Sequence, residues 1–484
     1  MKKTTKFVVA AIITVCLSFV AIFGGCTINV GENGKDGKDA AEINWQDIYQ
    51  RVNEELAAEG KEELSFGEFV KNYLGAREES ASQIVINHSL LSSVSIFTSF
   101  DYKTTLSNGW LGGSKTVEYS SIYCGSGVIV ELDKEKGDAV VITNCHVVYD
   151  GSAANEFSND VRLYLYGQDT ADINFTVSGQ ALGYSSSGDQ IIDMNISNDD
   201  NYRIDAQIIG ASLTYDIAVL KVENSEVLKR SSATVATFAD DSAYPKAGNN
   251  CYAVGNPAGY GTSVTYGLVS VDSETISLDI KENGTATDYR VMRTDTAING
   301  GNSGGGLYNV YGDLIGIVNA KMVEEGTDNM GYALPSTTVK RVYRSLVNNA
   351  DEFNYSSGFG IRHAKLGIIC NIESGADANA SKYERVKVSE ISSSSLWRNI
   401  LKSDDTIEKI EVGTATSKLG DIYEEELEEF TARDGAQVVR KFIVDDLLLG
   451  VDIGDTVKLT ISRGNKTYYA YVTYSSASDF TKSE

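Results

Sequence analysis

A chain of 484 residues, 42% of them hydrophobic, is long enough to bury the cores of two or more domains. Its formal net charge of −25 disfavours nucleic acid as a partner. Many Leu, Ile, Val, Tyr and Gly residues, together with only three prolines, indicate a mainly β globular protein and exclude a disordered one.

The N-terminal residues 1–26 are typical of a targeting segment. Lysines precede a long apolar run, and two glycines lead from that run to Cys26. The segment resembles a bacterial lipoprotein signal, in which Cys26 is lipidated and becomes the mature N-terminus. The alternative is an uncleaved membrane anchor, because the apolar run is just long enough to span a bilayer. Both interpretations predict an extracytoplasmic, membrane-tethered protein.

A polar, glycine-rich stretch predicts a flexible linker at 27–44. A helical segment is expected at 45–80, because apolar residues recur there at helical spacing from Trp45 onward. Ser65 precedes a second short apolar run and is a candidate N-cap. This segment is expected to form a small helical hairpin between anchor and protease, with partner binding or self-association as the alternative role.

The most informative stretch is 295–306, in which Ser303 lies among five glycines. Glycine adopts positive φ freely, so successive N–H groups can turn toward one point beside the serine hydroxyl. That is how an oxyanion hole is built. A glycine-rich turn between two strands is the plain structural alternative.

A serine nucleophile needs a base, and the base needs a carboxylate that orients it. His146 lies in the stretch 139–148, an apolar, β-branched strand that ends in small polar residues, which suits a base presented at a strand end. Asp216 directly precedes an apolar strand that would bury it, and a histidine partner would explain a buried charge there. The alternative for Asp216 is a turn residue that caps the strand.

The other two histidines, His88 and His363, lie among polar neighbours and are expected on the surface. The segment around Ser303 also fits the nucleophile elbow of α/β-hydrolases. In that fold the acid and the histidine follow the serine, whereas His146 and Asp216 precede it here. The chain also shows strands without alternating helices, so the elbow interpretation is rejected.

Seven motifs support one family resemblance when they are taken in order. They are residues 124–129, 143–148, 216–222, 254–257, 264–270, 295–306 and 331–335. Across roughly residues 84–345 the chain resembles the HtrA/DegP-like serine proteases of the chymotrypsin-fold superfamily. The resemblance implies two six-stranded β-barrels in a protease domain at 81–350.

The resemblance also implies the chemistry. It assigns catalysis to His146, Asp216 and Ser303, with a backbone oxyanion hole from Gly301, Asn302 and Ser303. An acyl-enzyme mechanism of this kind uses no metal and no cofactor. Where the family commonly has proline, this chain has Gly300 and Gly306. We therefore hypothesise that the oxyanion loop is disordered or misaligned at rest and orders when substrate binds.

Substrate preference can be argued from the residue six positions before the nucleophile, which lies at the base of the primary pocket in chymotrypsin-fold proteases. Here that residue is Ala297. With Ile317 and Val318 nearby, a small apolar pocket is expected, which would accept Val, Ala or Ile side chains. Such side chains are buried in folded proteins, so unfolded or damaged proteins are the expected substrates.

From about residue 351 the composition changes, and the segments 366–369, 386–391, 400–410 and 454–463 resemble a PDZ domain. The resemblance predicts a PDZ-like domain at 351–484. Leu366, Gly367 and Ile368 stand where its carboxylate-binding loop would be, so peptide C-termini are expected partners.

Two further features leave alternatives open. Residues 152–203 are longer than the family needs and suggest an extended hairpin or a surface loop. In related extracellular proteases a disulfide ties the strand of the Gly-Ser-Gly motif to the region of the histidine, so Cys124 and Cys145 are a candidate pair. Free buried thiols are the alternative.

The sequence is therefore interpreted as an extracytoplasmic serine endopeptidase for protein quality control. The alternative is a binding protein or holdase chaperone that uses the cleft and the PDZ-like domain without turnover. The family resemblance also suggests a homotrimer.

Overall fold

A computed structural model describes residues 45–58, 60–61, 63–69, 78–107, 114–167, 177–185, 189–196, 201–241, 244–278, 287–321, 330–353, 361–377 and 382–482. Contacts divide the chain into two units, separated after Glu63. The predicted targeting segment with Cys26 and the predicted linker at 27–44 lie outside the described residues. None of the helices that the structure describes is long and apolar enough to cross a membrane.

The helical segment expected at 45–80 contains α2 (Trp45–Ala58) in the first unit and α3 (Phe66–Phe69) in the second. Ser65 caps α3 as predicted: its hydroxyl accepts from the Glu68 amide at 3.2 Å, and the Glu68 carboxylate accepts from the Ser65 amide at 2.9 Å. The helix α4 (Glu78–Leu91) then leads into the first barrel.

The surface position expected for His88 is wrong. Its ring stacks on Phe66 with 4.0 Å between centroids, and only 5% of the residue is exposed. Burial disfavours the charged imidazole and lowers the pKa of His88 to about 4. Its polar neighbours in the sequence do not reveal that the last turns of α4 face α3. His363 is half-buried and not fully solvated, and burial lowers its pKa as well.

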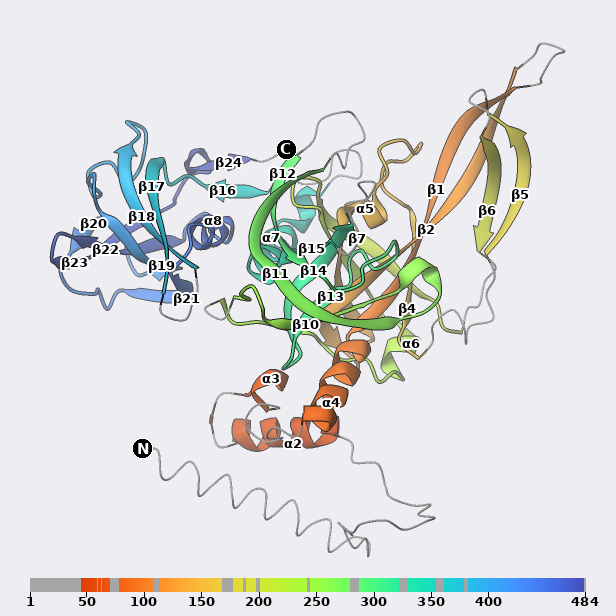
Figure 1. Ribbon diagram of the computed structural model, residues 1–484, viewed down its shortest axis with the longest axis horizontal. Helices are drawn as coiled ribbons and strands as arrows, with labels where there is room; N and C mark the ends of the chain where they lie inside the picture. The colour runs from red at the N-terminus through yellow and green to blue at the C-terminus, as the bar shows by residue number, and fades with distance from the viewer. Residues whose placement is uncertain are drawn as a thin grey trace, which may run out of the picture. The chain divides into compact units, whose positions relative to one another are not determined.

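The first barrel is closed and has six strands in the order β1-β2-β3-β8-β7-β4 (Figure 1). Burial alternates along only part of these strands, and five of the six residues at 217–222 are buried. The strands are β1 (Ser93–Ser107), β2 (Ser114–Asp133), β3 (Asp138–Thr143), β4 (Asp160–Leu165), β7 (Ile204–Ser212) and β8 (Ile217–Val222). The short helices α5 (Cys145–Val148) and α6 (Glu226–Lys229) follow β3 and β8.

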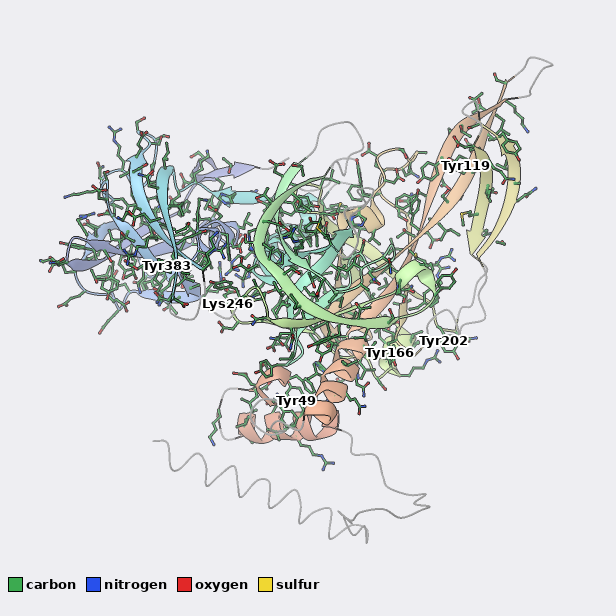
Figure 2. The ribbon with its side chains drawn as sticks, in the orientation of Figure 1. Tyr49, Tyr119, Tyr166, Tyr202, Lys246 and Tyr383 are labelled. Carbon is green, nitrogen blue, oxygen red and sulfur yellow. The ribbon has the colours of Figure 1, made fainter. Side chains whose placement is uncertain are left out.

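The long segment at 152–203 contributes a hairpin of β5 (Val177–Tyr184) and β6 (Gln190–Ile196). The hairpin lies beside the outer ends of β1 and β2, where Tyr119 is labelled in Figure 2. The Ser120 amide donates to Asp193 Oδ1 at 2.9 Å, and Leu106 forms a bridge with Ser185. Of the two alternatives, the hairpin is therefore the one observed.

The second barrel follows β10-β11-β12-β15-β14-β13, and pairing of β13 with β10 and β14 closes the ring. The short β9 (Thr237–Phe238) adds in parallel to β14. The ring consists of β10 (Asn250–Gly255), β11 (Ser263–Leu278), β12 (Thr287–Thr294), β13 (Gly306–Asn309), β14 (Asp313–Lys321) and β15 (Gly331–Pro335). A 3₁₀ turn, η4 (Pro257–Gly259), follows β10. The prediction of a mainly β protein with a closed six-stranded barrel is confirmed.

The helix α7 (Ser336–Asn348) and the turn η5 (Ala350–Glu352) lead to a C-terminal sheet. Its order is β17-β18-β19-β22-β23-β20, and β21 pairs with β19. Its elements are β17 (Ile368–Ala376), β18 (Lys382–Ile391), β19 (Thr406–Ala415), β20 (Gly420–Tyr423), β21 (Phe430–Gln437), α8 (Phe442–Leu449), β22 (Thr456–Arg463) and β23 (Lys466–Thr473). A separate pair joins β16 (Arg362–Ala364) to β24 (Phe480–Lys482), which follows the turn η6 (Ala477–Asp479).

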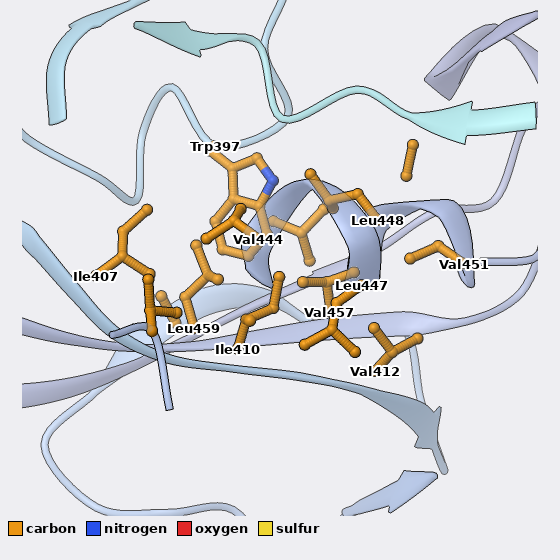
Figure 3. Close-up of a cluster of buried hydrophobic side chains, with 14 of the residues drawn as sticks. Trp397, Ile407, Ile410, Val412, Val444, Leu447, Leu448, Val451, Val457 and Leu459 are labelled. Carbon is orange, nitrogen blue, oxygen red and sulfur yellow. The ribbon is translucent and has the colours of Figure 1, made fainter. Parts of the chain in front are cut away.

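The core under this sheet is apolar and centres on Trp397, against which α8 packs Val444 and Leu448 (Figure 3). The opposite side of α8 carries a buried carboxylate, Asp446. Asp446 there accepts from Thr337 Oγ1 at 2.5 Å, from Thr338 Oγ1 at 2.9 Å and from the guanidinium of Arg290 on β12. One helix therefore carries both the C-terminal core and an ionic contact to the second barrel.

Candidate active site

The structure brings His146 and Asp216 into direct contact. His146 Nδ1 lies 2.7 Å from Asp216 Oδ2, and the His146 main-chain amide donates to Asp216 Oδ1 at 2.9 Å. Asn144 Nδ2 donates to the Asp216 carbonyl oxygen at 2.9 Å. The two residues meet because β3 and β8 are neighbours in the barrel. His146 follows the end of β3, and Asp216 directly precedes β8.

Asp216 is fully buried and has a φ of 50°, in the left-handed region that few residues other than Gly, Asn and Asp adopt. This conformation turns the chain between β7 and β8 and directs the carboxylate toward α5. A buried carboxylate with hydrogen bonds to both a histidine ring and a histidine amide is well placed to fix the ring's tautomer and orientation.

The side chain of His146 is 36% exposed, so one edge of the ring is accessible while the other faces Asp216. Burial lowers the pKa of His146, but the charge of Asp216 and the hydrogen bond to it raise the pKa more, so the net shift is upward. The ring is therefore a stronger base than a free histidine.

Ser303 lies just before β13, at the edge of the second barrel. Its hydroxyl donates to the main-chain oxygen of Asn319 on β14 at 2.9 Å. Its main-chain oxygen accepts from the Ser126 amide on β2 at 2.8 Å, which ties it to the first barrel. The serine therefore sits at the junction of the two barrels.

Asn319 is a site residue that the sequence reasoning missed. Its Nδ2 donates to Asp216 Oδ2 at 2.6 Å, and its Oδ1 accepts from the Tyr289 hydroxyl at 3.0 Å. The signal was present, because Asn319 directly follows the apolar run 314–318 on a strand expected to be buried. A buried amide in such a place requires partners.

The loop before Ser303 is held by hydrogen bonds. The Ala258 amide donates to the Gly300 oxygen at 2.7 Å, Ser126 Oγ donates to the Gly301 oxygen at 2.7 Å, and the Asn302 amide donates to the Asn299 oxygen at 3.0 Å. With these carbonyls engaged, the loop is an ordered turn. The hypothesis of a misaligned resting loop stays a prediction.

Two glycines of the loop are required by their backbone. Gly301 has a φ of 94°, and a Cβ there would lie 2.2 Å from the Asn256 oxygen. Gly304 has a φ of 84°, and a Cβ there would lie 2.1 Å from the Ser126 oxygen. Glycine is required at Gly306 for a different reason, because the Tyr308 ring occupies the space that a larger residue such as proline would need.

The residues predicted to form an apolar pocket are not brought together. Ala297 is exposed, whereas Ile317 and Val318 are fully buried in two different core clusters. The prediction for Ile317 and Val318 is wrong for a geometric reason. Successive residues of a strand point to opposite faces, so neighbours cannot line the same pocket.

The cysteines that the structure describes are free thiols, so the candidate bridge between Cys124 and Cys145 is not formed. Cys145 packs in the core of the first barrel, and Cys124 packs with Phe97 and Tyr164 in a separate cluster. Burial, followed by the charge of Asp216, raises the pKa of Cys145 well above its ordinary value.

Leu366, Gly367 and Ile368 line a groove of about 360 Å³ between β17 and α8. The Leu366 oxygen accepts from Ser395 Oγ at 2.7 Å, and the Gly367 oxygen accepts from the Ser392 amide at 2.9 Å. Val386, Val444 and Leu448 are among the apolar residues that line it. Within the described part of the chain, β17 pairs with β18 alone.

The sequence of this chain is similar to those of known proteins. Residues 125–317 match the family described as a trypsin-like peptidase domain. The serine protease Do-like HtrA of Lactococcus lactis subsp. lactis (strain IL1403) is 30% identical over 368 residues, which cover 74% of this chain and 72% of that protein. The protein of the same name from Bacillus subtilis (strain 168) is 28% identical over 368 residues, covering 70% of this chain and 68% of that protein.

The periplasmic serine endoprotease DegP of Escherichia coli (strain K12) is 28% identical over 282 residues, covering 58% of this chain and 44% of DegP. Among solved structures, an HtrA-type protease AlgW with decapeptide has a TM-score of 0.41 and 17% identity, covering 83% of this chain and 99% of that one. On the sequence matches, this chain belongs to the HtrA family of trypsin-like serine proteases and is a serine-type endopeptidase.

Proposed function

We propose that the chain is an extracytoplasmic endopeptidase that cleaves unfolded or damaged proteins, with Ser303 as nucleophile, His146 as base and Asp216 as the carboxylate that orients the base. The observation that carries the proposal is the pair of hydrogen bonds, 2.9 and 2.7 Å, by which the Asp216 carboxylate holds the His146 amide and ring. An exposed ring edge and a serine at the barrel junction complete the arrangement.

In this mechanism Ser303 Oγ leaves the Asn319 oxygen, gives its proton to His146 Nε2 and attacks the substrate carbonyl carbon. The amides of Gly301 and Ser303 stabilise the oxyanion. Asn302 lies between them, and its own amide donates to Asn299. His146 then gives the proton to the leaving amine, and water hydrolyses the acyl-enzyme in the same way.

The decisive experiment is cleavage of reduced casein by the full chain and by its Ser303→Ala form, with product ends read by mass spectrometry. We expect cuts by the wild type alone, after small uncharged side chains, since Ala297 brings no charge to the pocket base. Equal cutting by both forms would refute the role of Ser303. No cutting by either, with suppression of casein aggregation by both, would favour the holdase function.

We also propose that the groove between β17 and α8 belongs to a PDZ-like domain at 351–484 and binds peptide C-termini. A peptide strand could add to the free edge of β17 while its carboxylate meets the loop of Leu366, Gly367 and Ile368. Amidated and free-acid versions of one apolar peptide provide the test. Equal affinity for the two versions would refute carboxylate recognition.

For location, we propose membrane tethering through Cys26 and a homotrimeric assembly. The relative named a periplasmic endoprotease supports the extracytoplasmic side. Mass spectrometry of the N-terminal peptide from the membrane fraction, compared with a Cys26→Ser variant, tests whether Cys26 is lipidated. Light scattering of the detergent-solubilised chain tests whether its mass is that of a trimer.

A further inference from the structure

Asn319 connects two parts of the proposed catalytic machinery. Its side-chain amide donates to Asp216 Oδ2 at 2.6 Å, and its main-chain oxygen accepts from Ser303 Oγ at 2.9 Å. The residue is fully buried on β14. A side chain in that position has few alternative rotamers and no access to bulk water, so its hydrogen bonds must be satisfied within the protein.

The orientation of the Asn319 amide is set by Tyr289 on β12. The Tyr289 hydroxyl donates to Asn319 Oδ1 at 3.0 Å, and Tyr289 is only 5% exposed. If the amide were flipped, its oxygen would face the Asp216 carboxylate oxygen and the two acceptors would repel. The tyrosine donor therefore favours the one orientation in which the amide nitrogen faces the carboxylate.

We infer that Tyr289 and Asn319 form a positioning pair for Asp216, in which the hydroxyl fixes the amide and the amide fixes the carboxylate that holds His146. This inference rests on the proposed roles of Asp216 and His146. Neither side chain of the pair takes part in a proton transfer. Both act through the geometry and the charge distribution of the carboxylate.

The pair also has an electrostatic effect. Asp216 Oδ2 accepts from both Asn319 Nδ2 and His146 Nδ1, so the two donors share the charge of one oxygen. Without the amide, more of that charge would act on the imidazolium, and the proton of His146 would be held more tightly.

Among the residues that the structure describes, two other titratable groups face this cluster, Cys145 on α5 and Tyr289 on β12. Burial and then the charge of Asp216 raise the pKa of each. Both therefore stay neutral where His146 titrates. A change in the acidic limb of the activity profile therefore reports on the histidine and its carboxylate.

The test uses the full chain with Tyr289→Phe and Asn319→Ala, and follows kcat/KM for a peptide substrate against pH. For Tyr289→Phe we expect kcat/KM to fall about threefold to tenfold, the effect of one buried hydrogen bond. We also expect the acidic limb to move to higher pH by about a few tenths of a unit. Both effects should be larger for Asn319→Ala.

The matched control is Tyr308→Phe, which removes a buried hydroxyl 3.2 Å from Ser92 Oγ in the same core cluster. It should lower the melting temperature without moving the acidic limb. If Tyr289→Phe behaves like this control, the inference is overturned. An inactive wild type, or a Ser303→Ala form as active as the wild type, would instead overturn the proposed function.

Asn319→Ala removes more atoms and has the greater risk of misfolding. If it does not fold, Tyr289→Phe still decides the question, because it removes a single oxygen atom and keeps the ring in the core. Titration of the His146 ring by NMR in the Tyr289→Phe form provides a readout that does not depend on turnover. An unchanged ring pKa would count against the inference.

Discussion

Ser303 Oγ donates to the main-chain oxygen of Asn319 at 2.9 Å, on the same residue whose side chain donates to Asp216. The proposed nucleophile is therefore hydrogen-bonded to a neutral carbonyl, which does not remove its proton. In the proposed mechanism the hydroxyl leaves this acceptor for His146, and the Oγ proton is transferred only after that exchange.

The Asp216 carboxylate should control the pH dependence of hydrolysis. In Asp216→Asn the charge that raises the pKa of His146 is lost while burial, which lowers that pKa, remains. The acidic limb of kcat/KM should move to lower pH, and the rate should fall about 10⁴-fold because the amide favours the wrong tautomer. A profile measured from pH 5 to 9 checks both effects. An unshifted limb would contradict this assignment.

The contact between His146 and Asp216 should also make the free energy of unfolding depend on pH. The folded pKa of His146 lies above its ordinary value of 6.5, so folding favours the protonated ring. This contribution is fully present below pH 6.5 and is lost as the pH rises through the folded pKa. Urea unfolding at several pH values should show the loss in the wild type. His146→Gln should lack that component, and an identical slope in both proteins would argue against it.

Two adjacent glycines of the serine loop should respond very differently to alanine. Gly301→Ala places a Cβ 2.2 Å from the Asn256 oxygen at a φ of 94°, so the loop must move and activity should be lost. Gly300→Ala meets no atom within 4 Å and should keep most of the activity. Casein hydrolysis and melting temperatures of both variants provide the measurement. Equal losses of casein hydrolysis in the two variants would contradict this loop geometry.

Ser126 should support the oxyanion loop through its hydroxyl. Ser126 Oγ donates to the Gly301 oxygen at 2.7 Å and accepts from the Asn256 amide at 2.8 Å. Ser126→Ala should lower kcat about tenfold with little change in KM, because one buried hydrogen bond that orients the loop is lost. Ser158→Ala, which removes a buried hydroxyl bound to the Ser99 oxygen at 2.9 Å, is the matched control. A similar fall in kcat for both would indicate a general effect on folding.

Neighbouring aspartates of α8 allow a test of the buried ionic contact. Asp446→Ala would leave the partly buried guanidinium of Arg290 without its carboxylate, and should destabilise the protein by about 3 kcal/mol, the lower end for a buried pair. Asp445 is half-exposed and pairs with Lys441 on the surface, so Asp445→Ala should cost no more than about 1 kcal/mol. Denaturant unfolding distinguishes the two. Equal costs would mean that the contact to β12 contributes little.

The sequence was sufficient to find His146, Asp216 and Ser303 as candidates, because a nucleophile, its base and its acid each leave a local signature at a strand end or in a glycine-rich turn. Asn319 and Tyr289 leave no such signature. Their partners are far away in the chain, and only the closure of the second barrel brings them to Asp216.

Two errors have a common origin, since each came from reading a local pattern without the neighbouring element. His88 looked like a surface residue until α3 was seen to cover it. Ile317 and Val318 looked like pocket residues, although the twofold alternation of a strand already excludes a shared pocket. The second error could have been avoided from the sequence alone.

The hydrogen bond from the Ser126 amide to the Ser303 oxygen joins a strand of one barrel to the Ser303 segment of the other. His146 and Asp216 belong to the first barrel, so no folded half of the protease region contains all three proposed residues. A newly made chain would acquire its cutting ability only after both barrels have folded and docked. Chains that are still folding would therefore be unable to cleave one another until their two barrels have docked.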